Sequence, residues 1–226
     1  MSSKFDFSEL SSKWFELDGP MKMLHRMNDA RIKLVTRYVA KHHHGLDVGS
    51  GAGIFPIAFT KKGYSCDALE KKEELIKVGK LRAQSQDVAL SWHQSDLLGF
   101  KGELQYDYLT CFEVIEHIED RAAFLEKVQS LVKPGGYIFF STLNRTLASY
   151  LTTVLGAEYI LKLLPIGTHD YRLFIKPQEL SNLLDKSSVI DLHGLIYNPF
   201  TRSFFLGSST SANYIGVWQK DQSSIS

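Results

Sequence analysis

The stretch Leu46-Asp47-Val48-Gly49-Ser50-Gly51-Ala52-Gly53 decides the fold of this 226-residue chain. An apolar run leads directly into three glycines at alternate positions, as expected where a buried strand turns into a helix. Glycines at this spacing let the backbone approach a ligand closely, and the start of the next helix presents N–H groups without intrahelical partners. We therefore predict that a cofactor binds at this turn, with a tight turn without a ligand as the alternative.

The glycine spacing argues against a dinucleotide as that cofactor. Dinucleotide folds use G-x-G-x-x-G and hold a pyrophosphate at the helix N-terminus. This chain instead has G-x-G-x-G, formed by Gly49, Gly51 and Gly53, with Asp47 just before the turn. Because a carboxylate repels a pyrophosphate, the turn suits a cationic ligand, such as a sulfonium that carries an α-amino group.

Composition and charge restrict the class of protein. Lys+Arg number 26 and Asp+Glu 25, so the net charge of +1 gives no overall signature of nucleic-acid binding, and we predict no nucleic-acid partner. The two cysteines, Cys66 and Cys111, lie in apolar runs, which indicates a reducing compartment without a disulfide framework. The first residues lack the basic and apolar segments of a secretory signal. We therefore expect a cytoplasmic protein.

Strand and helix patterns alternate along the chain, as is typical of parallel βαβ units. The predicted fold class is α/β: a mostly parallel sheet with an antiparallel C-terminal strand pair, in a single domain. Strands are expected at 45–48, 65–69, 89–93, 106–112, 137–142, 189–196 and 214–219, and core helices at 54–62, 72–84 and 121–132. A turn is expected at 133–136, and helical periodicity at 30–39.

This reading divides the domain into five parts. They are a helical cap (1–44), a cofactor-binding core (45–143), a helical insertion after the fifth strand (144–176), the C-terminal part of the sheet (177–220) and a disordered tail (221–226). The insertion is strongly apolar, but Glu158 and Lys162 interrupt it and Pro165 ends it, so we do not expect a membrane span. A lid, a membrane-surface helix and a helix packed on its own domain remain open.

Acidic residues follow the second and third predicted strands, where ligands bind in such sheets. Glu70 is placed to accept hydrogen bonds from both ribose hydroxyls of a nucleoside, and Asp96 to accept one from an adenine amino group. Each has an ordinary alternative, since exposed acids are common at strand ends and Asp96 also suits a helix N-cap or turn.

The densest group of reactive side chains follows the fourth strand. Glu113, Glu116 and His117 are spaced so that they share one face of a helical turn. Two carboxylates and an imidazole at this spacing suit a divalent cation, Mg²⁺ or Mn²⁺, with positions left open for a substrate. The alternative is that acids in a first helical turn are favoured by the helix dipole alone.

Together these motifs resemble class I S-adenosylmethionine (SAM)-dependent methyltransferases, which have a Rossmann-like fold. Further segments outside the cofactor motifs resemble one family, the ubiquinone biosynthesis O-methyltransferases, also described as 3-demethylubiquinol or 2-polyprenyl-6-hydroxyphenol methyltransferases. The resemblance runs from about Trp14 to about Trp218. The matching segments are 24–28 with Arg31, 110–117, 140–145, 156–161, 167–170 and 174–177.

The resemblance implies that SAM methylates a phenolic hydroxyl of a polyprenylated catechol or benzoquinol, at two steps of ubiquinone synthesis, with a divalent cation. It places SAM contacts at Arg31, Gly49, Glu70 and Phe112, and metal ligands at Glu113, Glu116 and His117. It also implies that residues 144–170 meet an anionic membrane surface at the inner face of the membrane, and an association with other enzymes of ubiquinone synthesis. His169 is a candidate proton acceptor, with a structural role as its alternative.

The chain departs from the family pattern at three places. Glu70 stands where Asp is common, the turn 50–53 is less glycine-rich, and Ser211 stands where an Asp commonly precedes Asn213-Tyr214. The third departure leaves open whether the C-terminal strands shape the substrate pocket in the usual way.

Three other functions compete with this interpretation. A metal-independent methyltransferase with another apolar acceptor also fits, because a Glu-His pair after the fourth strand occurs in methyltransferases that need no metal. A nucleic-acid methyltransferase would typically carry Asn-Pro-Pro-Tyr after the fourth strand, where this chain has Phe112-Glu113-Val114-Ile115. A non-catalytic lipid-binding module is disfavoured by the intact glycines and Glu70.

Overall fold

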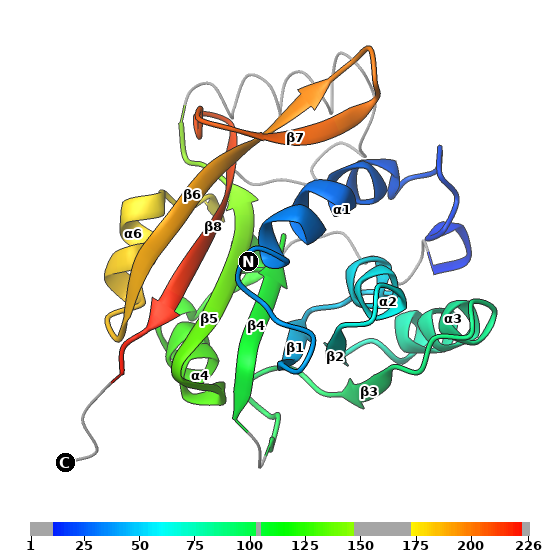
Figure 1. Ribbon diagram of the computed structural model, residues 1–226, viewed down its shortest axis with the longest axis horizontal. Coiled ribbons are helices and arrows are strands. Elements are labelled where there is room, and N and C mark those ends of the chain that lie inside the picture. The colour runs from blue at the N-terminus through cyan, green and yellow to red at the C-terminus, as the bar shows by residue number, and fades with distance from the viewer. Residues whose placement is uncertain (1–10, 103–104, 147–172, 223–226) are drawn as a thin grey trace.

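A computed structural model describes residues 11–102, 105–146 and 173–222, which form an α/β fold around one sheet (Figure 1). The strand order in this part of the chain is β3-β2-β1-β4-β5-β8-β6-β7. The strands are β1 (His44–Val48), β2 (Ser65–Glu70), β3 (Ser91–Gln94), β4 (Tyr106–Phe112), β5 (Val132–Leu143), β6 (Ser187–Asn198), β7 (Ser203–Gly207) and β8 (Asn213–Lys220). The helices are α1 (Lys22–Val35), α2 (Ile54–Lys61), α3 (Glu73–Gln84), the short 3-10 helix η2 (Ile115–His117), α4 (Arg121–Leu131) and α6 (Pro177–Leu183).

The sheet changes from parallel to antiparallel at β5. The pairs β1–β2, β1–β4, β2–β3 and β4–β5 are parallel, whereas β8 runs antiparallel to both β5 and β6. The predicted mostly parallel sheet with an antiparallel C-terminal pair is therefore confirmed. An additional strand, β7, pairs with β6 at the edge.

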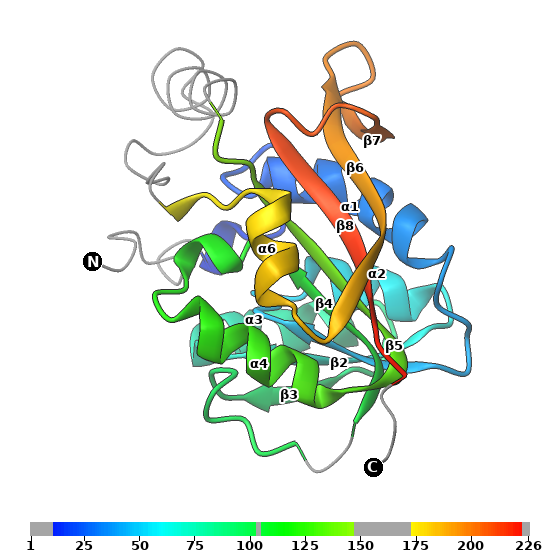
Figure 2. The same cartoon turned by 90° about the vertical axis from the view of Figure 1, so that its left-hand side faces the viewer.

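Helices cover both faces of the sheet, which makes its central strands apolar on both sides. Successive residues of β5 point to opposite faces. Phe139 packs with α1 and α2, whereas Ile138 and Phe140 pack with Phe124 of α4 and Leu180 of α6. Figure 2 shows α4 and α6 together over the second face. The apolar run from Tyr137 to Phe140 in β5 is the sequence signature of this double coverage.

The predicted core helices and strands are confirmed, with differences at their ends. The turn expected at 133–136 is instead part of β5, which begins at Val132 and accommodates Gly135 at a φ of 75°. The N-terminal helix spans Lys22–Val35 and so starts before the predicted periodic stretch at 30–39. Neither β7 nor α6 was predicted, because both are short, with five and seven residues.

Several expectations concern residues outside the described ones, namely 1–10, 147–172 and 223–226. They include most of the predicted insertion and most of the predicted tail. Of the tail, Asp221 is described, and its backbone N–H donates to Lys186 O at 2.9 Å. In the part of the chain that the structure covers, no helix is long and apolar enough to cross a membrane.

Gly45 tests how tightly the sheet centre is packed. A Cβ there would lie 2.1 Å from Cζ of Tyr108, a fully buried ring whose hydroxyl donates to Ser65 O at 2.6 Å. We expect Gly45→Ala to lower the free energy of unfolding by about 1–3 kcal/mol, measured by urea denaturation. The Tyr108 ring cannot move aside easily, because its backbone lies in β4 and its hydroxyl is bonded to Ser65 O.

Gly135→Ala is the matched control for this substitution. Its Cβ would have no neighbour closer than 3.5 Å, so only the φ of 75° is strained, at a cost of about 1–2 kcal/mol. If Gly45→Ala proves as stable as the wild-type protein, the packing argument is wrong.

Candidate cofactor and active site

The predicted site residues meet because three parallel strands end side by side. In the order β2-β1-β4, the carboxyl ends of these strands lie at one edge of the sheet. Glu70 ends β2, the glycine turn follows β1, and Glu113 follows β4. Ligand binding at this edge is the general rule for open α/β sheets.

The glycine turn has the backbone conformation that its sequence predicts. Gly49, Gly51 and Gly53 have φ values of 68°, 57° and 87°, a region that favours glycine. Leu69 O, at the end of β2, accepts hydrogen bonds from Gly49 N at 2.9 Å and from Ser50 N at 3.1 Å. The turn is therefore fixed to the neighbouring strand before any ligand arrives.

Each of these glycines also faces a side chain at close range. A Cβ at Gly49 would lie 2.5 Å from Val114 Cγ2, and one at Gly51 would lie 2.5 Å from Trp14 Cζ2. A Cβ at Gly53 would lie 2.9 Å from Trp92. Protein packing therefore favours glycine at all three positions. Our sequence analysis did not place Trp14 or Trp92 at the turn, because no fixed spacing links them to it.

Asp47 is buried behind the turn. Its side chain is 4% exposed, and its Oδ1 accepts a hydrogen bond from Thr110 Oγ1 at 2.6 Å. Burial raises the pKa of Asp47 from 3.8 to about 7, although the hydrogen bonds and the charge of Arg31 oppose this shift. A cationic ligand nearby would favour the ionised carboxylate and lower this pKa.

The two acids that follow β2 and β3 differ in their surroundings. Glu70 is 8% exposed; its Oε2 accepts from Gly51 N, and its Oε1 from Lys71 N and Lys72 N, each at 2.9 Å. Asp96 is exposed, and its Oδ1 accepts from Gly99 N at 2.7 Å. Glu70 is therefore bonded to the glycine turn, whereas Asp96 closes a separate turn. The predicted contacts of these two acids with a nucleoside stay predictions.

A partly buried ion pair links the cap to the end of β4. Arg31 is 4% exposed, and its Nη2 donates to Glu113 Oε1 at 3.1 Å. Ser141 Oγ donates to the same oxygen at 2.6 Å, and the guanidinium lies over the ring of Phe112, 5.0 Å from its centroid. Arg31 Nε has no hydrogen-bond partner among the described residues, so this buried donor is available to a ligand. Glu113 has a φ of 55°, a strained value for a residue with a side chain.

A second buried acid lies next to this pair. Glu116 is 3% exposed, and its Oε2 accepts from Thr142 Oγ1 at 2.9 Å. Burial and then the nearby Glu113 carboxylate raise the pKa of Glu116 well above its ordinary value. Tyr214 pairs with Thr142 across β5 and β8; it is fully buried, and its hydroxyl has no hydrogen-bond partner in the described structure. Sequence analysis missed Ser141, Thr142 and Tyr214 as polar groups of the site.

The predicted metal site is not formed by these side chains as they stand. Within residues 11–102, 105–146 and 173–222, no group of three or more His, Cys, Asp or Glu is arranged to hold a metal ion. Glu116 and His117 lie in η2, whereas Glu113 precedes it, and the Glu113 carboxylate is already bonded to Arg31 and Ser141. The other predicted catalytic residue, His169, lies outside the described residues.

Comparison with known sequences decides the family. Residues 23–188 match the methyltransferase domain family. The ubiquinone biosynthesis O-methyltransferase of Coxiella burnetii is 37% identical over 216 residues, which cover 94% of this chain and 92% of the relative. The chain belongs to the ubiquinone biosynthesis O-methyltransferase family. The family member of Vibrio parahaemolyticus is 38% identical and is covered to 92%, as is this chain.

Solved structures give the same fold at much lower identity. Magnesium protoporphyrin IX methyltransferase from Synechocystis, solved with bound S-adenosylhomocysteine (SAH), superposes with a TM-score of 0.65 at 16% identity, covering 98% of this chain and 90% of the other. A SAM-dependent methyltransferase from Thermotoga maritima, possibly acting on histamine, gives 0.67 at 13% identity, with 96% and 98% covered. The fold class is therefore that of the SAM-dependent methyltransferases, and this member of the O-methyltransferase family uses SAM as methyl donor.

We expect the binding of SAM to depend on pH through Asp47. Because its pKa is about 7 in the free protein and the cationic sulfonium favours the ionised form, affinity is expected to rise with pH, by roughly tenfold between pH 6 and pH 7.5. The dissociation constant measured by calorimetry across this range tests the expectation.

Asp47→Asn should remove most of this pH dependence and weaken binding at pH 7.5. Asp67→Asn, which alters an acid near the amino end of β2, is the control and should leave the profile unchanged. An unaltered profile in Asp47→Asn would contradict the assignment.

Proposed function

We propose that this protein transfers the methyl group of SAM to a phenolic hydroxyl of polyprenylated catechol and benzoquinol intermediates, at two steps of ubiquinone synthesis. The observation that carries the proposal is the 37–38% identity to ubiquinone biosynthesis O-methyltransferases over more than nine-tenths of both chains. The positive-φ glycine turn and the buried acids beside it support the same activity.

The residues at the turn fit the chemistry of SAM. Gly51 leaves no room for a side chain, so a ligand there meets backbone rather than side-chain atoms. The buried Asp47 suits a positive ligand, and the free Nε of Arg31 suits a carboxylate. SAM supplies an electrophilic methyl group on a sulfonium. The chain's part is to hold the acceptor oxygen in line with it, since such alignment contributes several kcal/mol to catalysis.

The acceptor phenol must also lose its proton, because a phenol with a pKa near 10 is mostly protonated at neutral pH. We propose His169 as the proton acceptor on the strength of the family resemblance. Glu113 and Glu116 face the same end of the sheet and would hold the acceptor's polar groups near the glycine turn. The buried side chain of Glu116 and the partly buried side chain of Glu113 limit the access of water to that part of the site.

We further propose that a divalent cation, Mg²⁺ or Mn²⁺, binds at Glu113, Glu116 and His117. The Glu113 carboxylate lies close enough to Glu116 to disfavour its charge, and two carboxylates so arranged suit a cation. As they stand the three residues form no ready-made metal site, so Glu113 would have to release Arg31. When bound, such a cation favours the phenolate of a chelated catechol.

A metal-independent methyltransferase is the second candidate function. One observation favours it specifically: the guanidinium of Arg31 already supplies the positive charge beside Glu113. In that case Arg31 rather than a metal ion balances the buried acids.

The location of the protein in the cell follows from the lipid nature of the proposed acceptor. We propose that residues 144–170 contact an anionic membrane surface, so that the protein associates peripherally with the inner face of the membrane and with other enzymes of ubiquinone synthesis. The larger part of this segment lies outside the described residues, and the support for the proposal is the resemblance alone.

Methyl transfer from labelled SAM to a short-chain prenylated catechol in lipid vesicles tests the main proposal. We expect transfer to the phenolic oxygen, and none to the catechol already methylated at both oxygens. The matched control variant is Gly51→Ala, whose Cβ would collide with Trp14 and which should abolish SAM binding and transfer together. SAM binding by the wild-type protein without transfer to any prenylated phenol would contradict the proposal.

Chelation separates the two candidate functions. If the cation proposal is right, EDTA lowers turnover by about tenfold or more, and added Mn²⁺ gives a bound-ion signal in electron paramagnetic resonance that His117→Ala weakens. Glu126→Gln, which alters an exposed acid of α4, should change neither quantity. Full turnover in EDTA would favour the metal-independent enzyme.

A further inference from the structure

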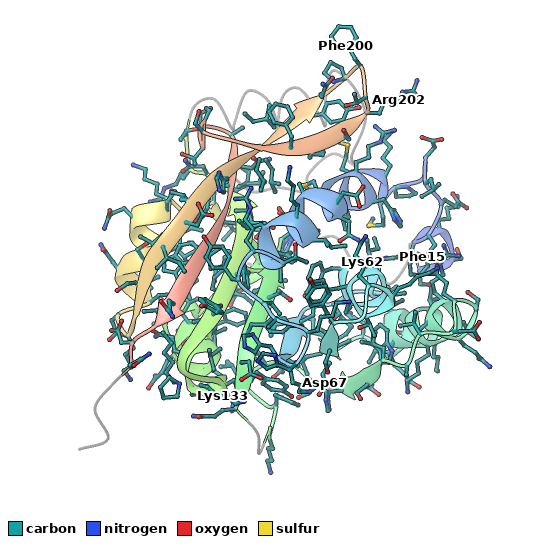
Figure 3. All side chains as sticks on the ribbon, in the orientation of Figure 1. Phe15, Lys62, Asp67, Lys133, Phe200 and Arg202 are labelled. Atoms are coloured by element: carbon teal, nitrogen blue, oxygen red, sulfur yellow. The ribbon has the colours of Figure 1, made fainter. Side chains whose placement is uncertain are left out.

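The β6–β7 hairpin projects beyond the sheet at the end where the cofactor site lies (Figure 3). Leu143, at the end of β5, pairs with Asn213, at the start of β8. Strand β6 pairs with β8 as far as Ile215 and then continues to Asn198 at the hairpin tip. The tip therefore rises above the same sheet edge as the glycine turn.

The two faces of the hairpin have different surroundings. The rings of Tyr197 and Phe204 contact each other at a tilt on the inner face, where Phe204 packs on the core formed with α1. The Tyr197 hydroxyl accepts a hydrogen bond from Arg26 at 3.0 Å. Ile196 and Phe205 pair on the opposite face, and Phe205 is 48% exposed. The inner face fixes the hairpin to the domain, and the outer face leaves apolar side chains in contact with water.

The hairpin turn holds a phenylalanine almost completely in solvent. Phe200 is 95% exposed, the highest value among the large hydrophobic side chains of the described residues. Asn198 Oδ1 accepts hydrogen bonds from Phe200 N at 2.9 Å and from Thr201 N at 3.3 Å, and Arg202 has a φ of 52°. Side-chain hydrogen bonds to the backbone define such turns, so the local structure itself directs Phe200 outward.

Charge at the tip selects the kind of partner. Residues 192–220 contain no Asp or Glu, whereas Arg202 lies at the tip beside Phe200. An aromatic ring next to a basic side chain, without acids, suits the boundary between lipid headgroups and acyl chains. A stable protein interface needs roughly 800 Å² from each partner, far more than the tip of a two-stranded hairpin presents.

We propose that the tip of the β6–β7 hairpin, with Phe200, Arg202 and Phe205, inserts into the surface of an anionic lipid bilayer. The cofactor site, at the same edge of the sheet, then faces the lipid. This membrane contact deepens the proposed function and rests on it, since a polyprenylated acceptor lies in the bilayer. It assigns membrane contact to a segment other than residues 144–170.

Sedimentation of the full chain with vesicles tests the proposal. The vesicles contain phosphatidylcholine with or without phosphatidylglycerol. Phe200→Ser is expected to lower the partition coefficient about tenfold on the anionic vesicles, because it removes most of the apolar area at the tip. Arg202→Gln should lower it about fivefold on the anionic vesicles and leave it unchanged on phosphatidylcholine alone.

Matched controls come from exposed residues elsewhere on the surface. Leu81→Ser in α3 removes an exposed apolar side chain, and Lys62→Gln after α2 removes an exposed charge. Both should bind vesicles like the wild-type protein. Melting curves followed by circular dichroism check that all variants are folded.

Three results would overturn the proposal: no vesicle binding by the wild-type protein, unchanged binding by Phe200→Ser, or a change of Phe200→Ser from dimer to monomer without a change in vesicle binding. The last would make the tip an interface between copies of the chain.

Methyl transfer to a water-soluble, short-chain catechol keeps the two proposals distinguishable. Phe200→Ser should retain it, and a wild-type protein that binds vesicles but transfers no methyl group would contradict only the proposed function.

Discussion

The ion pair between the buried Arg31 and the partly buried Glu113 is the interaction on which the site depends. Burying a guanidinium is costly unless a carboxylate meets it, and removing one partner of such a pair typically costs about 3–5 kcal/mol. Here the pair joins α1 to the residue directly after β4. Glu113 keeps its strained φ of 55° because Ser141 also holds it, through the backbone and through the side chain. Helical cap and sheet edge are therefore positioned together.

The electrostatics of this edge indicate a site adapted to positive ligands. Asp47 and Glu116 are both buried and both have raised pKa values, so each loses part of its charge in the free protein. A bound cation restores that charge and is stabilised in return, because ligand binding and carboxylate ionisation are linked. One guanidinium, that of Arg31, offsets the charge of the acids meanwhile, which explains why it is buried despite the lowering of its own pKa by desolvation.

Sequence patterns predicted the cofactor half of the molecule well, because there the chemistry is local. The glycines after β1 and the apolar runs of the parallel strands each specify their own conformation, and Glu70 and Glu113 follow from their places at strand ends. The remainder of the site comes from residues distant in sequence. Trp14 reaches the turn from the N-terminal segment, and Tyr214 reaches Thr142 only through the pairing of β5 with β8. No periodic pattern in the sequence predicts such contacts between distant residues.

The metal prediction shows the limit of the same reasoning. The spacing of Glu113, Glu116 and His117 predicts one shared helical turn, but only Glu116 and His117 lie in η2, and Glu113 precedes it with a φ of 55°. Spacing says nothing about competing partners, however, and Arg31 has taken the carboxylate that a metal ion would need first. Because Arg31 also carries the free Nε that suits the carboxylate of SAM, the carboxylates of SAM and of Glu113 would compete for one guanidinium, and the arrival of SAM would favour the release of Glu113. The bonding partner of Arg31 thus connects the part of the site that binds the methyl donor to the part that binds the acceptor.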